Sequence, residues 1–209
     1  NIQQLTHNDL YDVYPCWSPD GTKIAYESGN PDIGVSFRIW VMDADGSNPR
    51  ELTTPPTGYL DEEPAWSPDG TKIAYVRRDA NTGSSVGIYV INAGGPAGVG
   101  TLLINGNANR PSWSPDGSEI AYGNYPINVA DASTGGFKRS LGDGYDPCWS
   151  PDGTKITFGA SGESGSSVWV MNAADGSNRQ QLSDPPYGYE DEDPNWSPDG
   201  TKIVFMRLS

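Results

Sequence analysis

Five residues each stand directly before a Pro-x-Trp triplet, and they are the residues of this sequence best placed to do chemistry together. They are Tyr14, Glu63, Arg110, Asp146 and Asp193. Hard cations such as Ca²⁺ take oxygen ligands, so Glu63, Asp146 and Asp193 are the candidate metal ligands. Two other interpretations stay open: Arg110 simply neutralises its neighbours, or the acids are only solvated charge.

Two acidic segments that lead to Pro64 and Pro194 also carry tyrosines. Tyr59 lies in the first segment, and Tyr187 and Tyr189 lie in the second. Tyrosine is enriched where proteins bind partners, and its ring is also compatible with stacking on a sugar. Glycoside hydrolysis needs only two carboxylates. We expect these three tyrosines to contact a partner, and a calcium-dependent glycan-binding or carbohydrate-active protein stays open as the alternative.

Other catalytic chemistry is hard to assemble from this sequence. The only histidine is His7, so there is no zinc-hydrolase motif, and no Gly-x-Ser-x-Gly motif occurs. The segment from Asp43 to Gly46 lacks the full pattern and terminal Glu of an EF-hand calcium loop. Asp and Asn in such turns usually bond their own backbone. The sequence therefore favours a function without catalysis.

The elements that position these residues are repeats. Trp-Ser-Pro-Asp-Gly begins at Trp17, Trp66, Trp113, Trp149 and Trp196, with starts 49, 47, 36 and 47 residues apart. Each copy precedes an alternating segment such as Thr-Lys-Ile-Ala-Tyr, which is typical of a strand. Because Asp-Gly lies between two strands, it predicts a hairpin. We expect these five tryptophans to be largely buried between repeats.

A second hairpin completes each repeat. Arg-Ile-Trp-Val-Met-Asp at 38–43 leads through Asp-Gly-Ser-Asn to Arg-Glu-Leu-Thr at 50–53, and similar segments occur at 167–183. Four antiparallel strands in about 40–45 residues make one β-propeller blade. The sequence predicts an all-β propeller of about five blades in a single domain. The blades are expected near 15–53, 64–104, 111–141 and 147–183, and at 194–209 together with 1–6.

The repeat resembles the WD40-like (PD40) repeat of TolB-type propellers. The resemblance rests on Trp-Ser-Pro-Asp-Gly-Thr-Lys-Ile-Ala-Tyr, Met-Asp-Ala-Asp-Gly-Ser-Asn and a closing Leu-Thr, and it covers nearly the whole chain. It implies the fold but little about activity. Members of the group include periplasmic translocation proteins, surface-layer proteins, peptidase-linked propellers and some polysaccharide lyases. Peptidase relatives keep their nucleophile on a separate domain, and the basic or metal-binding side chains of the lyases are missing here.

Composition limits the partners. The chain has 209 residues, a formal net charge of −14 and a pI near 4.2, which makes nucleic acid and anionic lipid poor partners. No run of 18 apolar residues predicts a membrane span. Few lysines among many Ser, Thr, Asn and Gly residues favour an exported protein: extracellular, periplasmic or at the cell surface. Cys16 and Cys148 fall on inner strands of blades one and four, so we expect two free thiols rather than a disulfide.

The sequence also repeats at a longer interval. Residues 45–66 recur at 175–196 with a constant offset of 130, so blades one and two resemble blades four and five. The last repeat ends after its second strand, which leaves its third strand missing. An unpaired strand edge is a template for pairing. We expect either the N-terminal strand, with Ile2 and Leu5, or a partner chain to complete this blade against Ile203 and Phe205. A third interpretation stays open: the sequence is a piece of a longer protein that supplies the missing strand itself.

The functional prediction follows from these features. Polar loops at 29–36, 79–85 and 159–166, with the acidic tyrosine-bearing segments, are where binding is expected on a rigid scaffold. We expect an exported, non-catalytic module for protein interaction or self-assembly, as an oligomer or filament. No cofactor is assigned, and Ca²⁺ at the acidic residues stays open.

Overall fold

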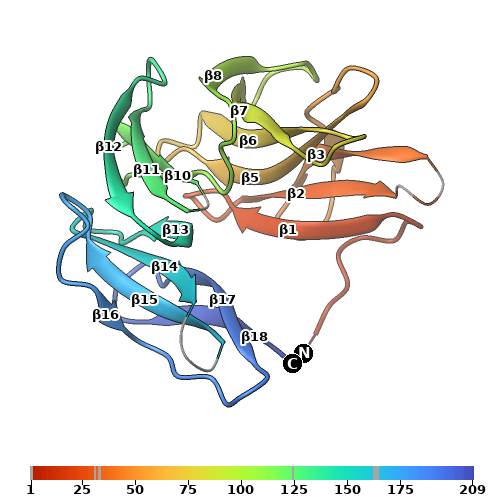
Figure 1. The fold of residues 1–209 in the computed structure, drawn as a ribbon. Coiled ribbons are helices and arrows are strands. Elements are labelled where there is room, and N and C mark those ends of the chain that lie inside the picture. Colours follow the sequence, from red (N-terminus) through yellow and green to blue (C-terminus); the bar gives the residue numbers. More distant parts are fainter. Residues whose placement is uncertain (1, 31, 33, 124, 162–164) are drawn as a thin grey trace. The chain divides into compact units, whose positions relative to one another are not determined.

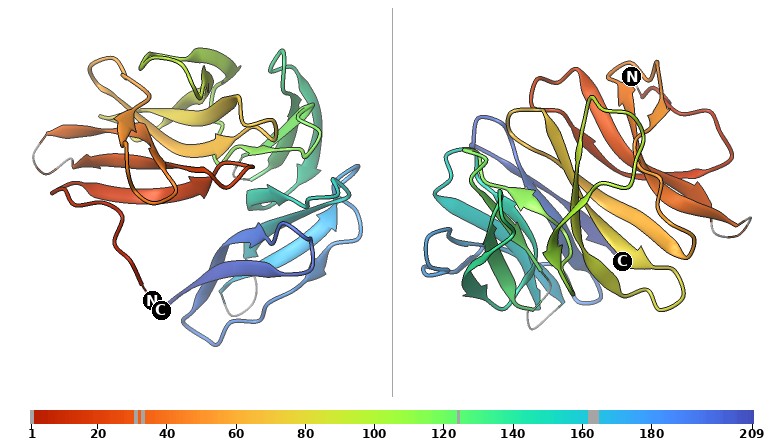
Figure 2. Two further views of the ribbon diagram at one scale, coloured as in Figure 1. Left: turned by 180° about the vertical axis from the view of Figure 1, so that it is seen from behind. Right: turned by 90° about the horizontal axis from the view of Figure 1, so that it is seen from above.

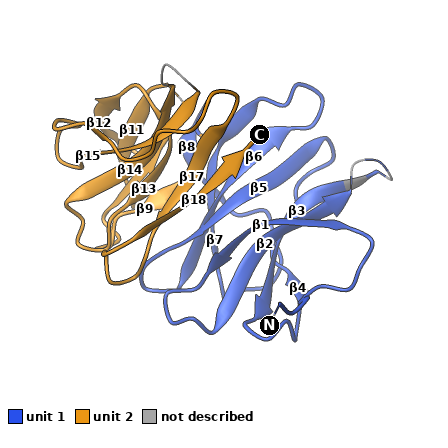
Figure 3. Ribbon diagram, turned by 90° about the horizontal axis from the view of Figure 1, so that it is seen from below, with its two compact units in different colours: residues 1–108 blue, residues 109–209 orange. Residues whose placement is uncertain are grey.

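The chain is built from strands throughout. The computed structural model describes residues 2–209 except 31, 33, 124 and 162–164. The described residues form the strands β1 to β18 and no α-helix (Figure 1). They divide into two compact units, Asn1–Ala108 and Asn109–Ser209 (Figure 3). The all-β prediction is therefore confirmed, and the expected loops at 29–36 and 159–166 fall partly outside the described residues.

The first unit contains two four-stranded antiparallel sheets, each with its strands in sequence order. Blade one consists of β1 (Tyr11–Trp17), β2 (Lys23–Asn30), β3 (Val35–Asp43) and β4 (Arg50–Glu51). Blade two consists of β5 (Tyr59–Trp66), β6 (Lys72–Asp79), β7 (Ser85–Asn92) and β8 (Thr101–Asn105).

The second unit contains two more four-stranded sheets and a two-stranded one, all antiparallel (Figure 2). Blade three consists of β9 (Ser112–Trp113), β10 (Glu119–Tyr122), β11 (Ile127–Asp131) and β12 (Phe137–Gly142). Blade four consists of β13 (Tyr145–Trp149), β14 (Lys155–Ser161), β15 (Ser166–Asn172) and β16 (Gln180–Gln181). The fifth sheet has only β17 (Glu190–Trp196) and β18 (Ile203–Leu208). Four blades are complete, and how the fifth sheet is completed stays a prediction.

The Ser-Pro-Asp-Gly turn closes each first hairpin through side chains of the motif itself. In blade one, Asp20 Oδ1 accepts hydrogen bonds from Ser18 Oγ at 2.6 Å, Thr22 N at 3.0 Å and Thr22 Oγ1 at 2.8 Å. Gly21 has φ 69°, a conformation that glycine adopts without strain. The same bonds recur at the other four copies, around Asp69, Asp116, Asp152 and Asp199. These aspartates shape turns, as expected for Asp in tight turns.

The turn aspartates predict a loss of stability in acid. Hydrogen bonds from the turn serine, and next from the turn threonine, lower the pKa of Asp20, Asp69 and Asp199 from 3.8 to about 2. Between these pH values the unfolded chain binds more protons than the folded chain, so stability falls as the pH falls from about 4 to about 2. Melting temperatures measured across this range should drop steeply. Asp→Asn changes at these turns should flatten the drop, and an unchanged slope would contradict the assignment.

Trp66 and Trp149 pack toward the preceding blade of their own unit, whereas Trp17 corrects one expectation. Trp66 donates from Nε1 to the carbonyl of Cys16 at 3.2 Å, packing against the core cluster that includes Ile39 and Tyr75. Trp149 is 8% exposed, but Trp17 is 59% exposed, so the prediction that all five are buried is wrong. Blade one is the first blade of its unit, and no earlier blade in that unit covers Trp17.

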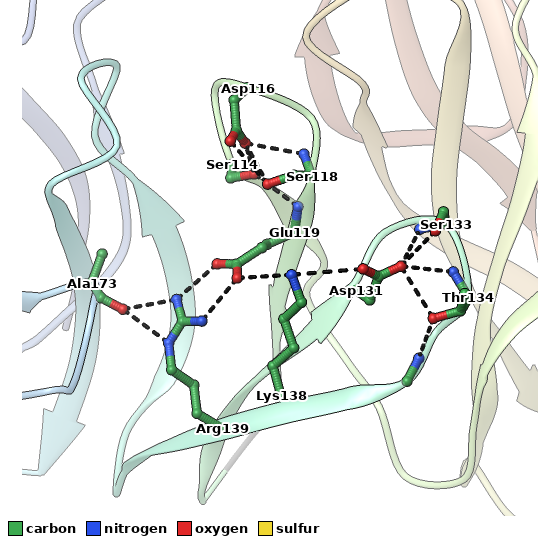
Figure 4. A network of polar contacts seen from close by, with 11 residues as sticks. Ser114, Asp116, Ser118, Glu119, Asp131, Ser133, Thr134, Lys138, Arg139 and Ala173 are labelled. Atoms are coloured by element: carbon green, nitrogen blue, oxygen red, sulfur yellow. Dashed lines mark hydrogen bonds and ion pairs between the residues drawn. The ribbon is translucent and has the colours of Figure 1, made fainter.

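Arginines of the fourth strands join neighbouring blades at their turn ends, where the Ser-Pro-Asp-Gly turns lie. In the first unit, Arg50 donates to the carbonyls of Ala93 and Gly95 in blade two. In the second unit, Arg139 pairs with Glu119 and donates to the carbonyl of Ala173 in blade four (Figure 4). Charge-assisted bonds of this kind are stronger than neutral ones. They hold the turn ends of adjacent blades together.

The N-terminal segment lies beside blade one without forming a strand. Residues 2–7 have no strand assignment, and Ile2 is fully exposed. Leu5 packs on the cluster of Ile24, Tyr26 and Met42, close to Gly46 of the third-to-fourth strand turn. Leu141 of β12 lies close to Gly176 of blade four, as Leu5 lies close to Gly46. Leu5 thus occupies the place that a fourth-strand leucine takes beside the next blade.

Candidate functional site

The residues before the five prolines share one unusual backbone conformation. Tyr14, Glu63, Arg110, Asp146 and Asp193 have φ values of 49°, 55°, 52°, 50° and 51°. Left-handed φ costs a residue with a β-carbon about 1–2 kcal/mol. Four of these residues lie where the pairing register of the inner strand shifts, as at a β-bulge. Pairing continues past the bulge, so the inner strands begin four or five residues earlier than expected in blades one, two and five.

Arginines hold all three of the predicted metal-binding carboxylates. In the second unit, Arg110 pairs with Asp146 at 3.2 Å and with Asp193 at 2.6 Å, so these two acids meet at one guanidinium. In the first unit, Glu63 pairs with Arg78 at 2.6 Å. Among the described residues, no group of three or more His, Cys, Asp or Glu side chains is arranged to hold a metal ion. Calcium binding stays a prediction, and this geometry favours neutralisation by arginine.

A buried ion pair joins Asp61 of β5 to Arg77 of β6, two residues before Glu63. Arg77 donates to both carboxylate oxygens of Asp61, at 2.7 and 2.8 Å, and the two side chains are 3% and 0% exposed. The guanidinium lies 4.3 Å from the ring centre of Tyr89. In the fifth sheet, Arg207 and Asp191 repeat the pair at 2.6 and 2.8 Å, but Arg207 is 43% exposed.

Sequence reasoning missed these two pairs, although a signal was available. Asp61 and Asp191, like Arg77 and Arg207, are 130 residues apart, which is the offset of the duplication. A search for charged residues at matched repeat positions would have found them. The ion pair thus recurs in both copies of the duplicated segment.

In each unit, exposed tyrosines lie at the loop ends of blades, which are the ends opposite the Ser-Pro-Asp-Gly turns. The five exposed members among the described tyrosines are Tyr11, Tyr14, Tyr125, Tyr187 and Tyr189, with exposures of 50, 44, 46, 92 and 40%. Tyr11 begins β1, Tyr187 and Tyr189 precede β17, and Tyr125 lies between β10 and β11. Tyr14 lies within β1, at its bulge. The predicted contact residues Tyr187 and Tyr189 are therefore available to a partner, whereas Tyr59 is half-buried.

The loop end of the fifth sheet is more acidic than its copy in blade two. Arg78 of blade two binds both Glu62 and Glu63, whereas Leu208 stands at the matching position of β18. Partial burial, and then the charges of Glu190 and Asp193, raise the pKa of Glu192. Tyr189, Glu190 and Leu208 line a recess of about 330 Å³ here. Acidic and aromatic side chains thus lie together at an open surface.

The thiols are placed for packing. Both cysteines are free, as predicted. Burial raises the pKa of Cys16 to about 12 and also raises that of Cys148, so both are protonated at neutral pH and poor nucleophiles. The Sγ atom of Cys16 donates to the carbonyl of Pro64 at 3.1 Å.

A groove of about 630 Å³ lies at the turn ends of blades three and four. Its acids include Asp116 and Asp152, which are bound in their own turns, and Glu119, which is bound to Arg139 (Figure 4). These groups are already satisfied, so the groove has little to offer a ligand.

The repeated four-stranded antiparallel blade with its inner-strand bulge defines a propeller-type protein. The chain matches the family model PD40, described as the TolB beta propeller domain, over residues 1–122 and 29–208. It therefore belongs to the TolB-like PD40 propeller family, which confirms the resemblance. In the described part of the chain no helix is both long and apolar enough to cross a membrane.

Three solved structures show the same fold. The putative TolB from Agrobacterium tumefaciens matches with a TM-score of 0.77 and 24% identity, over 98% of this chain and 73% of that one. TolB from Acinetobacter baumannii matches with a TM-score of 0.72 and 25% identity, over 88% of this chain and 47% of that one. An oligogalacturonate lyase from Vibrio parahaemolyticus matches with a TM-score of 0.59 and 15% identity, over 98% of this chain and 62% of that one. This likeness shows the fold alone. No curated protein sequence matches this chain.

Proposed function

We propose that this chain is an exported protein-interaction module without catalytic activity, and that it binds its partner with the loop ends of its blades. One observation carries the proposal: four of the five exposed tyrosines among the described residues, all but Tyr14, lie at loop ends. Tyrosine supplies large, rigid contact area and is enriched at interaction hot spots. Membership in the TolB-like propeller family supports this class of function.

The strained pre-proline residues lie at or near the bulges of the inner strands, on the loop side of the Pro-x-Trp triplet, and support binding at that side. Glycine would fit their φ values without strain, yet the chain carries a tyrosine or a charged residue at all five positions. Strain of this kind is kept where the side chain serves a function. The turn ends, by contrast, are tied by Arg50 and Arg139 to the next blade. The loop ends are therefore the binding ends.

Self-association is the second part of the proposal, because β18 offers an unpaired edge. Of the described strands only β17 pairs with β18, and Val204 is 68% exposed. An extended segment can add to such an edge as a further strand. A terminal segment of one copy that completes or abuts this sheet in another copy would give an oligomer or filament. Light scattering on the intact chain and on a chain lacking residues 1–6 tests this part of the proposal. If both proteins are monomers of equal stability, self-association is contradicted.

Affinity capture with matched variants tests the binding ends. A Tyr187→Ser, Tyr189→Ser variant should lose a protein that the original chain retains, and that protein should bind again when purified. Phe137→Ser, which changes an exposed side chain on β12, is the control and should retain it. Equal retention by all three proteins would contradict the proposal. So would strong, chelator-sensitive glycan binding on an array that is lost in Glu63→Gln with Asp193→Asn.

Replacing Tyr14 with glycine should separate binding from stability. Relief of the left-handed strain is worth about 1–2 kcal/mol, and the greater freedom of glycine in the unfolded chain costs about 0.5–1 kcal/mol. We expect Tyr14→Gly to keep its melting temperature or to raise it, while partner binding weakens. Thermal melts and titration with the captured partner measure the two effects. A less stable variant with unchanged binding would show that Tyr14 serves the fold.

A further inference from the structure

Two tyrosines of the second unit form an aromatic surface at the loop ends of blades three and four. The ring centres of Tyr125 and Tyr145 are 5.7 Å apart, with 43° between the ring planes. The hydroxyl of Tyr125 bonds with Oγ of Ser161 and accepts from its amide, and the ring of Tyr145 lies over Gly159 so closely that a β-carbon there would have no room. Tyr125 is 46% exposed. The pair therefore presents a fixed aromatic face to a partner.

Unpaired carboxylates lie beside this pair, on β17, which contacts β13. Burial is the main cause that raises the pKa of Tyr145 to about 12, and the charge of Glu192 adds to it, so this carboxylate lies close to the phenol. Glu190 is exposed two residues earlier on the same strand. Among the described residues, the arginines of this end bind other acids: Arg110 binds Asp146 and Asp193, and Arg207 binds Asp191. Negative charge without an arginine partner thus lies beside aromatic rings.

The copy of this end in blade two shows which cation fits it. Glu62 stands 130 residues before Glu192. Arg78 binds Glu62 through Nε at 2.7 Å and Glu63 through Nη2 at 2.6 Å. Leu208 stands at the position that matches Arg78. The second unit therefore keeps the carboxylate but does not supply the guanidinium that its copy binds.

Guanidinium groups also stack on aromatic rings elsewhere in this chain. Arg77 lies 4.3 Å from the ring centre of Tyr89, and Arg179 lies 4.7 Å from that of Phe158. A planar guanidinium can stack on a ring and bond a carboxylate at the same time, whereas the ammonium of lysine is a compact, strongly hydrated point charge. An arginine side chain that approached the second unit would meet both kinds of group together.

We propose that Tyr125, Tyr145 and Glu192 receive an arginine side chain of the protein partner. The arginine stacks on the tyrosines and binds Glu192 as Arg78 binds Glu62. The segment that carries it is basic, which complements the exposed Glu190 and the net charge of −14. The inference rests on the proposed binding at the loop ends, and it specifies the chemistry of the partner.

Fluorescence polarisation with labelled peptides tests the proposal. The probe is a short peptide of alternating arginine and glycine. One comparison peptide carries citrulline, a neutral isostere, in place of every arginine, and another carries lysine. The arginine peptide should bind the intact chain at least about tenfold more tightly than the citrulline peptide, and more tightly than the lysine peptide. Equal binding of the arginine and citrulline peptides, or of the arginine and lysine peptides, would overturn the inference.

Variants that remove a group localise the binding. Glu192→Gln and Tyr125→Ser should each weaken binding of the arginine peptide by at least about fivefold. Glu62→Gln removes the same charge at the matched position, where Arg78 is already bound, and should leave binding nearly unchanged. If Glu192→Gln and Glu62→Gln weaken binding equally, general attraction to an acidic chain explains it and the inference is wrong.

Variants that add a charge provide a test that removes none of the three proposed contact residues. Leu208→Arg supplies the guanidinium that the copy already has, so it should compete with the peptide and weaken its binding. Leu208 is 43% exposed and tolerates the change. Phe137→Arg adds the same charge at a 65% exposed residue at the turn end of blade three and is the control. Melting curves check every variant, and this pair remains decisive if Tyr125→Ser fails to fold. Equal effects of the two added arginines would contradict the inference.

The captured partner separates this inference from the proposed function. If Tyr187→Ser with Tyr189→Ser loses the partner but the arginine peptide does not bind, the loop ends bind a partner and its assigned chemistry is wrong. If the arginine peptide binds as expected but the partner is retained by that variant, the arginine site stands and the proposed role of Tyr187 and Tyr189 fails.

Discussion

Replacing Asp61 with asparagine should lower the free energy of unfolding of the first unit by about 3–5 kcal/mol. The change removes the negative partner of Arg77, whose side chain is 3% exposed. Water cannot solvate a guanidinium at that depth. Arg77 keeps the carbonyl of Val99 and the ring of Tyr89, but neither carries a compensating charge. The loss is therefore that of an uncompensated buried cation.

The matched change in the fifth sheet provides the control. Asp191→Asn removes the same bidentate partner from Arg207, which is 43% exposed and can be solvated by water. We expect a loss of about 1 kcal/mol, because Asp191 is buried but the arginine that it leaves behind reaches water, and ion pairs with a solvated partner contribute little. Denaturant titrations followed by tryptophan fluorescence compare the two variants. Equal losses would show that burial of the arginine does not decide the effect.

Replacing Trp66 with alanine should be as severe, at about 3–5 kcal/mol. The indole packs on the cluster that joins blades one and two, and it donates to the carbonyl of Cys16. Alanine leaves a cavity and an unbonded carbonyl at that interface. Urea midpoints of the purified variant measure the loss.

Trp17→Ala is the matched control, since Trp17 has the same place in the motif but is 59% exposed. Trp17→Ala should lower the free energy of unfolding by well under half as much as Trp66→Ala. If the two substitutions lower the free energy of unfolding equally, the motif tryptophan stabilises its own hairpin rather than the contact with the preceding blade.

The repeat made most of the fold predictable. Each Ser-Pro-Asp-Gly turn is closed by bonds among neighbours in sequence, such as Ser18, Asp20 and Thr22, so local residues determine the hairpin. The burial of a tryptophan is different, because it depends on a preceding blade. The sequence repeats Trp17 and Trp66 alike, but only Trp66 has such a blade within its unit. Position in the array therefore overrides the motif.

The candidate site was predictable in part. The Pro-x-Trp triplet located the five strained residues, because the triplet recurs with the bulge. The interpretation that Arg110 neutralises its neighbours agrees with its ion pairs to Asp146 and Asp193. The triplet gave no sign of Arg78, which reaches Glu63 across a strand pair. Exposure of Tyr187 and Tyr189 could be expected from their acidic loop, whereas the half-buried position of Tyr59 depends on packing.

Protection mapping of the chain with its captured partner tests directly whether the loop ends of the blades bind that partner. Hydrogen–deuterium exchange and hydroxyl-radical footprinting would be compared for the free chain and the complex. We expect protection at the loop ends, above all at Tyr125, Tyr187 and Tyr189, and at Tyr14 in β1, with the Ser-Pro-Asp-Gly turns unchanged. Protection confined to those turns or to the groove beside Arg139 would contradict it.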